Sequence, residues 1–236
     1  MESLKRLGEV LWAPTETFKK IAERPAWAVA LVLLLVLQGV VTFLAVQRID
    51  PEAQRQAMQE TLEERGLRGD ELERQLDTIT RAQSAFQPFA PVIGVVFGAG
   101  AYLLVALLFW VAFRLLGGEL TFPQAFATVL HAFMPLAIAG VLAIPVILGQ
   151  ETLDPEAVQR GSFLASNLAF LAPEDASATV LVLLTSVDLF TLWAVALLIL
   201  GFRVVARVST GAAAAVTIGL WAVWIGIKVG LAAVFG

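Results

Sequence analysis

The sequence predicts an all-α membrane protein with five transmembrane helices. Of its 236 residues, 58% are hydrophobic and only 15% are charged, and the mean hydropathy is +0.81. This balance is too apolar for a soluble domain of the same length. The apolar residues form long runs without the two-residue alternation of barrel strands, so we expect a helical bundle in which each helix satisfies its own backbone.

The N-terminal residues 1–25 predict an amphipathic collar of two short helices separated by Pro14. Leu7 and Val10 share one face of the first helix, and Phe18 and Ile21 share one face of the second. Basic residues occupy the remaining faces, namely Lys5, Arg6, Lys19, Lys20 and Arg24. We expect this collar to lie on the membrane surface, with its positive charges among anionic lipid headgroups.

Five apolar runs are each about 20 residues long, which is the length that a helix needs to cross the hydrocarbon layer. We expect the five spans at residues 26–47, 89–116, 123–148, 178–201 and 211–235. Two polar segments join successive spans on one side of the membrane. Residues 48–88 are expected to form a helical hairpin, and residues 149–177 a loop with a short helix that begins near Asp154.

The hairpin carries clear helix signals. Asp50 and Pro51 suit the N-cap and first-turn positions of a first helix. An apolar stripe marks the second helix and consists of Leu72, Leu76, Ile79 and Phe86. Because two short helices bury little surface by themselves, we expect this stripe to fold back on the partner helix or on the rim of the bundle.

Two pairs of glycines have the small-xxx-small spacing that lets a second helix approach closely. The second span carries Gly94 and Gly98, and the fifth span carries Gly226 and Gly230. We interpret both pairs as grooves for helix packing.

The third span is expected to bend. Pro135 cannot donate a hydrogen bond to the carbonyl of His131, so the helix should kink there and leave polar carbonyl groups inside the bundle. We interpret His131 as a hydrogen-bonding group between helices, with a ligand or proton relay as the alternative.

The fourth span contains an aspartate near its middle. On a continuous helix over residues 178–201, Asp188 would share a narrow polar stripe with Thr185 and Thr191. A carboxylate facing lipid at this depth costs at least about 2.5 kcal/mol, so Asp188 should be paired, protonated or directed toward a polar cavity. It either holds helices together or binds or moves a ligand.

Two further polar residues are expected at a similar depth in the membrane, Gln38 in the first span and Lys228 in the fifth. Lys228 either neutralises Asp188 or extends to the outer headgroups, and the sequence leaves both alternatives open. Together, Asp188, Lys228, Gln38, Thr185 and Thr191 form the predicted intramembrane polar cluster.

The positive charges indicate the orientation. Basic residues gather in the collar, after the second span at Arg114, and at Arg203 and Arg207 after the fourth span, whereas the two longer polar segments are acidic. Since short cytoplasmic segments are enriched in Lys and Arg, we expect a cytoplasmic N-terminus and an extracytoplasmic C-terminus.

Motifs for catalysis, phosphate binding and metal binding are missing from the sequence. It has no cysteine and a single histidine, which excludes thiolate sites and leaves His131 without a second imidazole. We therefore expect no enzymatic activity, no cofactor and no nucleic-acid partner.

Three stretches resemble the prokaryotic members of the Yip family, the Ypt/Rab-interacting proteins. The first reads PTETFKKIAERPAW at residues 14–27 and is similar to the family's N-terminal pattern. The others are the LGG and FPQAF motifs at residues 116–126 with Pro135, and the DLFTLW motif that begins at Asp188 and leads to Gly201. The resemblance covers nearly the whole chain except the hairpin.

This resemblance implies a five-span membrane protein with a cytoplasmic N-terminus, no cofactor and no established enzymatic activity. Eukaryotic relatives contact Rab GTPases in vesicle traffic and shape membranes, and some prokaryotic relatives look like accessory factors for membrane exporters. The collar is shorter than the N-terminal domain with which the eukaryotic relatives could recruit a GTPase.

We hypothesise that the chain lies in the inner membrane of a prokaryotic cell and organises or assists the assembly of other membrane components. Its partners would be the bilayer, anionic headgroups at the cytoplasmic face, and another membrane protein or a second copy of itself. The alternative is a small transporter or channel subunit that uses the carboxylate of Asp188.

Overall fold

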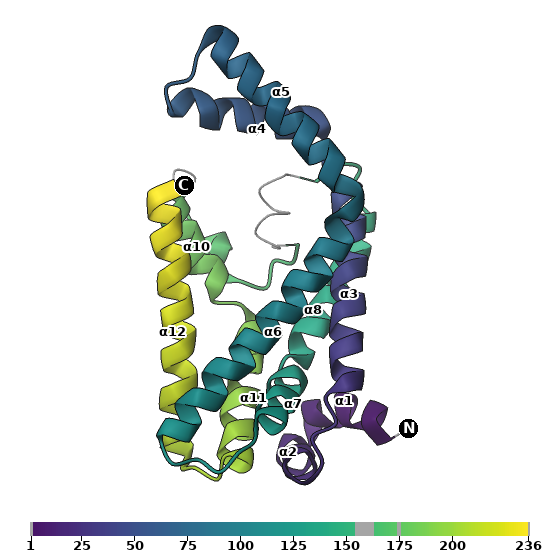
Figure 1. The fold of residues 1–236 in the computed structure, drawn as a ribbon, viewed down its shortest axis with the longest axis vertical. Coiled ribbons are helices and arrows are strands. Elements are labelled where there is room, and N and C mark those ends of the chain that lie inside the picture. The colour runs from purple at the N-terminus through teal and green to yellow at the C-terminus, as the bar shows by residue number, and fades with distance from the viewer. Residues whose placement is uncertain (1, 154–162, 174–175, 236) are drawn as a thin grey trace.

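The computed structural model describes residues 2–153, 163–173 and 176–235, and its regular elements are helices, which confirms the predicted all-α fold class (Figure 1). The N-terminal half comprises α1 (Glu2–Trp12), α2 (Pro14–Glu23), α3 (Ala28–Val46), α4 (Pro51–Glu64), α5 (Gly69–Phe86), η1 (Gln87–Phe89) and α6 (Ala90–Leu115). The C-terminal half comprises α7 (Phe122–Ala132), α8 (Met134–Leu148), η2 (Leu168–Leu171), α10 (Ala178–Ser186), α11 (Leu189–Val205) and α12 (Thr210–Phe235). The helix expected near Asp154 lies outside the described residues.

Among these residues, four helical stretches are long and apolar enough to cross a membrane, and they are Ala28–Val46, Gly69–Leu115, Phe122–Leu148 and Thr210–Val234. The remaining expected span is divided into α10 and α11. The collar and the N-terminus lie at one end of the bundle, and the α4–α5 hairpin and the C-terminus lie at the other (Figure 1). We call these the collar end and the hairpin end.

Aromatic side chains form the core at the collar end. Phe113 of α6 and Phe202 of α11 are fully buried, with ring centroids 4.7 Å apart. Phe109, one turn before Phe113, stacks on the same Phe202 ring at 4.6 Å. Because lipid tails are themselves apolar, these rings stabilise the bundle through their close packing on one another.

The collar packs against protein. Phe18 and Ile21 of α2 are fully buried, and α2 lies against α7 and α11. A Cβ atom at Gly201 of α11 would lie 2.9 Å from the Phe18 ring and 2.7 Å from Thr128 Cγ2, so only glycine leaves room for this contact. The apolar face of α2 is thus buried against α7 and α11 of the bundle. The expected position of the collar in the headgroup layer stays a prediction.

The third span is interrupted at Phe133, where α7 ends and α8 begins. Pro135 therefore stands in the first turn of α8, where its missing N–H group breaks no helical hydrogen bond. Pro145 lies inside α8, which continues to Leu148. The expected bend therefore coincides with the junction between two separate helices, α7 and α8.

The hairpin helices α4 and α5 pack on each other. The Asp50 side chain accepts a hydrogen bond from the Glu52 N–H at 2.8 Å and caps α4. Leu72 and Leu76 of the predicted stripe are buried and Ile79 packs beside them. Phe86, by contrast, is 63% exposed, because α5 continues through η1 into α6 and carries Phe86 away from α4.

Candidate functional site

Asp188 interrupts the fourth span. The helix that begins at Ala178 ends at Ser186, and a second helix begins at Leu189. Val187 has φ −98° and ψ 87°, and Asp188 has φ −118° and ψ 144°, so neither residue is helical and Asp188 is extended. The expectation of one continuous helix over residues 178–201 is wrong, because Asp188 acts as the N-cap of α11.

The Asp188 carboxylate is held by groups from both sides of the break. Its Oδ1 accepts hydrogen bonds from the N–H groups of Phe190 at 2.9 Å and Thr191 at 3.0 Å, and the Thr191 hydroxyl lies 3.5 Å away. Its Oδ2 accepts a hydrogen bond from the Ser166 hydroxyl. The positive end of the α11 dipole further favours a negative charge at this position.

The loop before α10 is also paired to this break through its backbone. The Leu189 N–H donates to the Ser166 carbonyl at 3.0 Å, and Asn167 forms an isolated antiparallel bridge with Asp188. Non-helical backbone inside a membrane protein is tolerated where such partners satisfy it. Ser166 is the partner that the sequence analysis missed.

The rest of the predicted polar cluster is dispersed. The Thr185 hydroxyl donates to the carbonyls of Leu181 and Val182 on its own helix, at 2.8 Å and 3.2 Å. In the part of the chain that the structure describes, no ion pair joins Asp188 to Lys228, which is half-buried on α12. The break at Val187 removes the helical register on which the predicted stripe depended.

Gln38 belongs to a different contact. Its side-chain amide donates to the carbonyl of Gly94 at 3.1 Å, and a Cβ atom at Gly98 would overlap the same amide group. A Cβ atom at Gly94 would lie 3.7 Å from the Thr42 hydroxyl. The groove predicted at Gly94 and Gly98 is therefore filled by α3 of the same chain.

His131 is buried in α7, with 1% of its surface exposed. Its Nδ1 lies 2.8 Å from the Ala127 carbonyl, to which it donates when protonated at that nitrogen. This bond is local to α7, whereas the predicted role was a bond between helices. Within the described ranges, no group of three or more His, Cys, Asp or Glu side chains gathers in one place.

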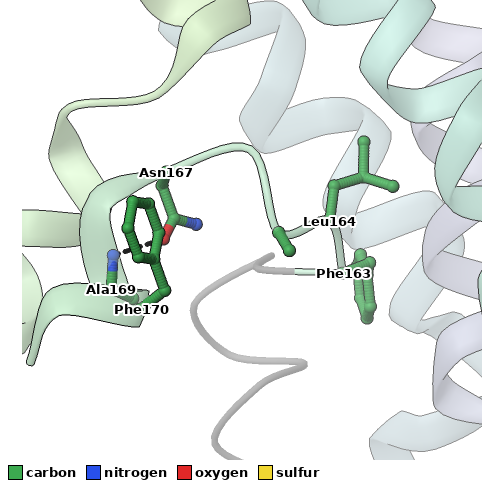
Figure 2. A pocket seen from close by; sticks show the side chains of 6 residues that line it. Phe163, Leu164, Asn167, Ala169 and Phe170 are labelled. Atoms are coloured by element: carbon green, nitrogen blue, oxygen red, sulfur yellow. Dashed lines mark hydrogen bonds between the residues drawn. The ribbon is translucent and has the colours of Figure 1, made fainter.

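The loop that holds Asp188 also lines a shallow hollow of about 240 Å³ (Figure 2). Its lining is apolar apart from one amide and consists of Phe163, Leu164, Ala165, Asn167, Ala169 and Phe170. The Asn167 side chain accepts from the Ala169 N–H at 2.9 Å, which leads the chain into η2. The one polar side chain of the hollow thus serves the fold of the loop.

The second glycine pair lies on an open surface. Among the residues that the structure describes, none has an atom within 4 Å of a Cβ atom placed at Gly226 or Gly230, and the same holds for Gly219. These glycines continue a row of exposed small residues that repeats every three or four positions along α12. We call this row the α12 stripe, and it consists of Gly211, Ala215, Gly219, Ala222, Gly226, Gly230 and Ala233.

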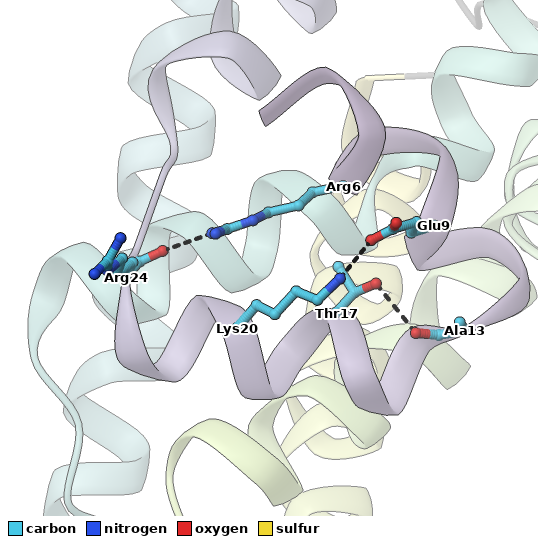
Figure 3. A network of polar contacts seen from close by, with 6 residues as sticks. All are labelled: Arg6, Glu9, Ala13, Thr17, Lys20 and Arg24. Atoms are coloured by element: carbon cyan, nitrogen blue, oxygen red, sulfur yellow. Dashed lines mark hydrogen bonds and ion pairs between the residues drawn. The ribbon is translucent and has the colours of Figure 1, made fainter. Parts of the chain in front are cut away.

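Several charged side chains of the collar form ion pairs or hydrogen bonds with other groups of the collar (Figure 3). Lys20 pairs with Glu9 at 2.8 Å and so ties α2 to α1. Arg6 is buried, contrary to the expectation that it lies on the polar face, and donates to the Arg24 carbonyl at 3.0 Å just after α2 ends. The Gln124 amide of α7 donates to the Ala22 carbonyl at 2.6 Å and joins the collar to the bundle.

These features define a multi-pass α-helical membrane protein with a docked N-terminal collar and one interrupted span. The family model described as the Yip1 domain matches residues 8–231. The chain belongs to the Yip family, as the three sequence stretches indicated. Comparison with curated proteins and with solved structures found no match.

Proposed function

We propose that this protein organises or assists the assembly of other membrane components, without catalysing a reaction, by binding a transmembrane helix along the α12 stripe. The supporting observation is the open row of small residues on α12. Association of helices in lipid depends on close van der Waals packing, and small residues let two backbones approach.

The contrast with α6 supports this assignment of the binding face. Gly94 and Gly98 have the same spacing as Gly226 and Gly230, but Gln38 and Thr42 of α3 already occupy their groove. Within the described parts of the chain, the α12 stripe has no such neighbour at Gly219, Gly226 or Gly230. A helix from a partner protein or from a second copy fits there without displacing a contact of this chain.

The environment of Asp188 favours this function over transport. A transporter needs its carboxylate to exchange ligands or protons during the cycle. The Asp188 oxygens instead accept bonds from Ser166, Phe190 and Thr191, and these bonds maintain the break between α10 and α11. The carboxylate therefore has a structural role that needs no transported ion.

The proposal includes a location in the inner membrane of a prokaryotic cell with the collar end in the cytoplasm. Exposed basic side chains at this end, such as Lys5, Arg24 and Arg203, can contact anionic headgroups. Lys19 and Lys20 contribute less, because Glu16 and Glu9 neutralise them at 2.7 Å and 2.8 Å.

Crosslinking in native membranes tests the α12 stripe. The chain has no cysteine, so a single cysteine at Ala222 reports on this face alone. We expect a specific crosslinked product that is lost when Gly226 and Gly230 are replaced by Leu. Gly100→Leu is the matched control, since Gly100 of α6 also has open space around it and lies outside the stripe. The mass of the product separates a partner protein from a second copy, and a product that persists in the double Leu variant contradicts the proposal.

A further inference from the structure

The two halves of the interrupted span, α10 and α11, differ in how many of their residues are buried. Helix α11 buries seven residues, and its neighbours include α2, α7, α8 and α12. In α10 only Ser186 is buried, and this helix packs chiefly against α12 and η2. Since resistance to local movement follows from buried contacts, α10 is the less constrained half.

Backbone hydrogen bonding also changes at the break. The Val187 N–H donates to Leu184 within α10, and the Leu192 N–H donates to Asp188 within α11. Between them, the N–H groups of Phe190 and Thr191 donate to the Asp188 side chain. Val187 and Asp188 have non-helical backbone angles and lie between these two sets of bonds, so the two helices can change their mutual angle there.

The loop before α10 connects the two halves a second time. At one end, Ser166 bonds Asp188 through its hydroxyl and Leu189 through its carbonyl, so the loop is fixed to the start of α11. At its other end, η2 packs on α10. The contacts of Ser166 with the start of α11 therefore help to fix the position of α10 relative to α11.

Helix α12 packs along both halves of the interrupted span, α11 and α10. It packs on α11 toward the collar end and on α10 toward the hairpin end. Counted from the turn that joins the antiparallel α11 and α12, Gly226 stands at about the same height as Asp188. Glycine weakens a helix interior, and the surroundings of Gly226 are open, so α12 can bend at the level of the break.

We propose that α10 and the hairpin-end part of α12 form an arm that pivots at Val187–Asp188, and that the Ser166–Asp188 hydrogen bond holds this arm in the observed position. The fixed part consists of α2, α7, α11 and the collar-end part of α6, which share the aromatic core around Phe202. The pivot does not depend on a partner helix at the α12 stripe.

Distance measurements between spin labels test the pivot in the full chain, reconstituted in lipid bilayers. Labels on cysteines at Leu183 of α10 and Leu107 in the collar-end part of α6 report on the arm, because both side chains are exposed. Labels at Leu192 of α11 and Leu107 of α6, also exposed, report on the fixed part. We expect Ser166→Ala to replace the single narrow distance peak of the arm pair with a broad or shifted distribution and to leave the second pair unchanged.

Two controls separate the pivot from loss of structure. Asp188→Asn keeps an acceptor oxygen for the N–H groups of Phe190 and Thr191, and its amide NH2 group can donate to the Ser166 hydroxyl oxygen, so its arm distance should equal that of the wild type. Ser84→Ala removes a hydroxyl that bonds only within exposed α5 and should change neither distance. An unchanged arm distance in Ser166→Ala, or an equal change in both label pairs, overturns the proposal.

Discussion

Gln38 of α3 donates a hydrogen bond to the Gly94 carbonyl of α6 at 3.1 Å, and its amide occupies the space that a side chain at position 98 would need. Gly98→Leu should therefore destabilise the protein by about 1–3 kcal/mol, since it overpacks a contact between two spans. Gly100→Leu, in open space on the same helix, should have little effect. Unfolding in mixed detergent micelles measures both free energies.

The same contact makes a second expectation possible. Gln38→Ala removes the amide that a larger residue at Gly98 would strike, so the double variant Gln38→Ala/Gly98→Ala should be more stable than the sum of the single effects allows. Strictly additive free energies would show that the two positions do not share this space.

These glycines illustrate what the sequence can predict. The small-xxx-small spacing indicates that a helix approaches closely, and a helix does approach Gly94 and Gly98. The spacing does not say which helix, because Gln38 lies far away in the sequence and its rotamer is set by packing. The same spacing occurs at Gly226 and Gly230, where the surface of α12 is open.

The five apolar runs predict the fold class because the length of a span follows from the bilayer thickness. The length of an apolar run does not show, however, whether the run forms one helix or two. Asp188 lies inside a run whose length predicts one helix. The break depends on Ser166, a serine of the preceding loop whose approach to Asp188 is a tertiary contact. A residue that favours N-caps, located inside an expected span, was the available signal.

Phe18 should control the docking of the collar. Phe18→Ala leaves a cavity beside Gly201 and Thr128 and should cost about 3–5 kcal/mol, enough to release α2 from the bundle. Limited trypsin digestion in detergent should then cleave faster after Lys19 or Lys20. Trp12→Ala is the control, because this side chain is largely exposed. Equal cleavage of the Phe18→Ala variant and the wild type would show that the collar is held by other contacts.

The orientation can be tested with single cysteines. Glu64 is the last residue of α4, Arg207 follows the end of α11, and both are exposed. Helix α4 lies at the hairpin end, and α11 ends at the collar end (Figure 1). Because basic residues gather at the collar end, a cysteine at Glu64 should react with an impermeant reagent in intact cells, and one at Arg207 should react only after the membrane is opened. Labelling of Arg207 alone in intact cells would reverse the orientation.

Asp188 caps α11, and among the described residues it forms no ion pair with Lys228. The cost of replacing it in free energy of unfolding can therefore be estimated. Asp188→Ala removes the acceptor for Phe190, Thr191 and Ser166 and should destabilise the protein by about 0.5–2 kcal/mol, whereas Asp188→Asn should cost much less because asparagine is also a good N-cap. Lys228→Met should add its own effect independently, since residues that do not interact give additive free energies. A double variant that is more stable than this sum, measured by unfolding in detergent, would instead indicate that Asp188 and Lys228 neutralise each other.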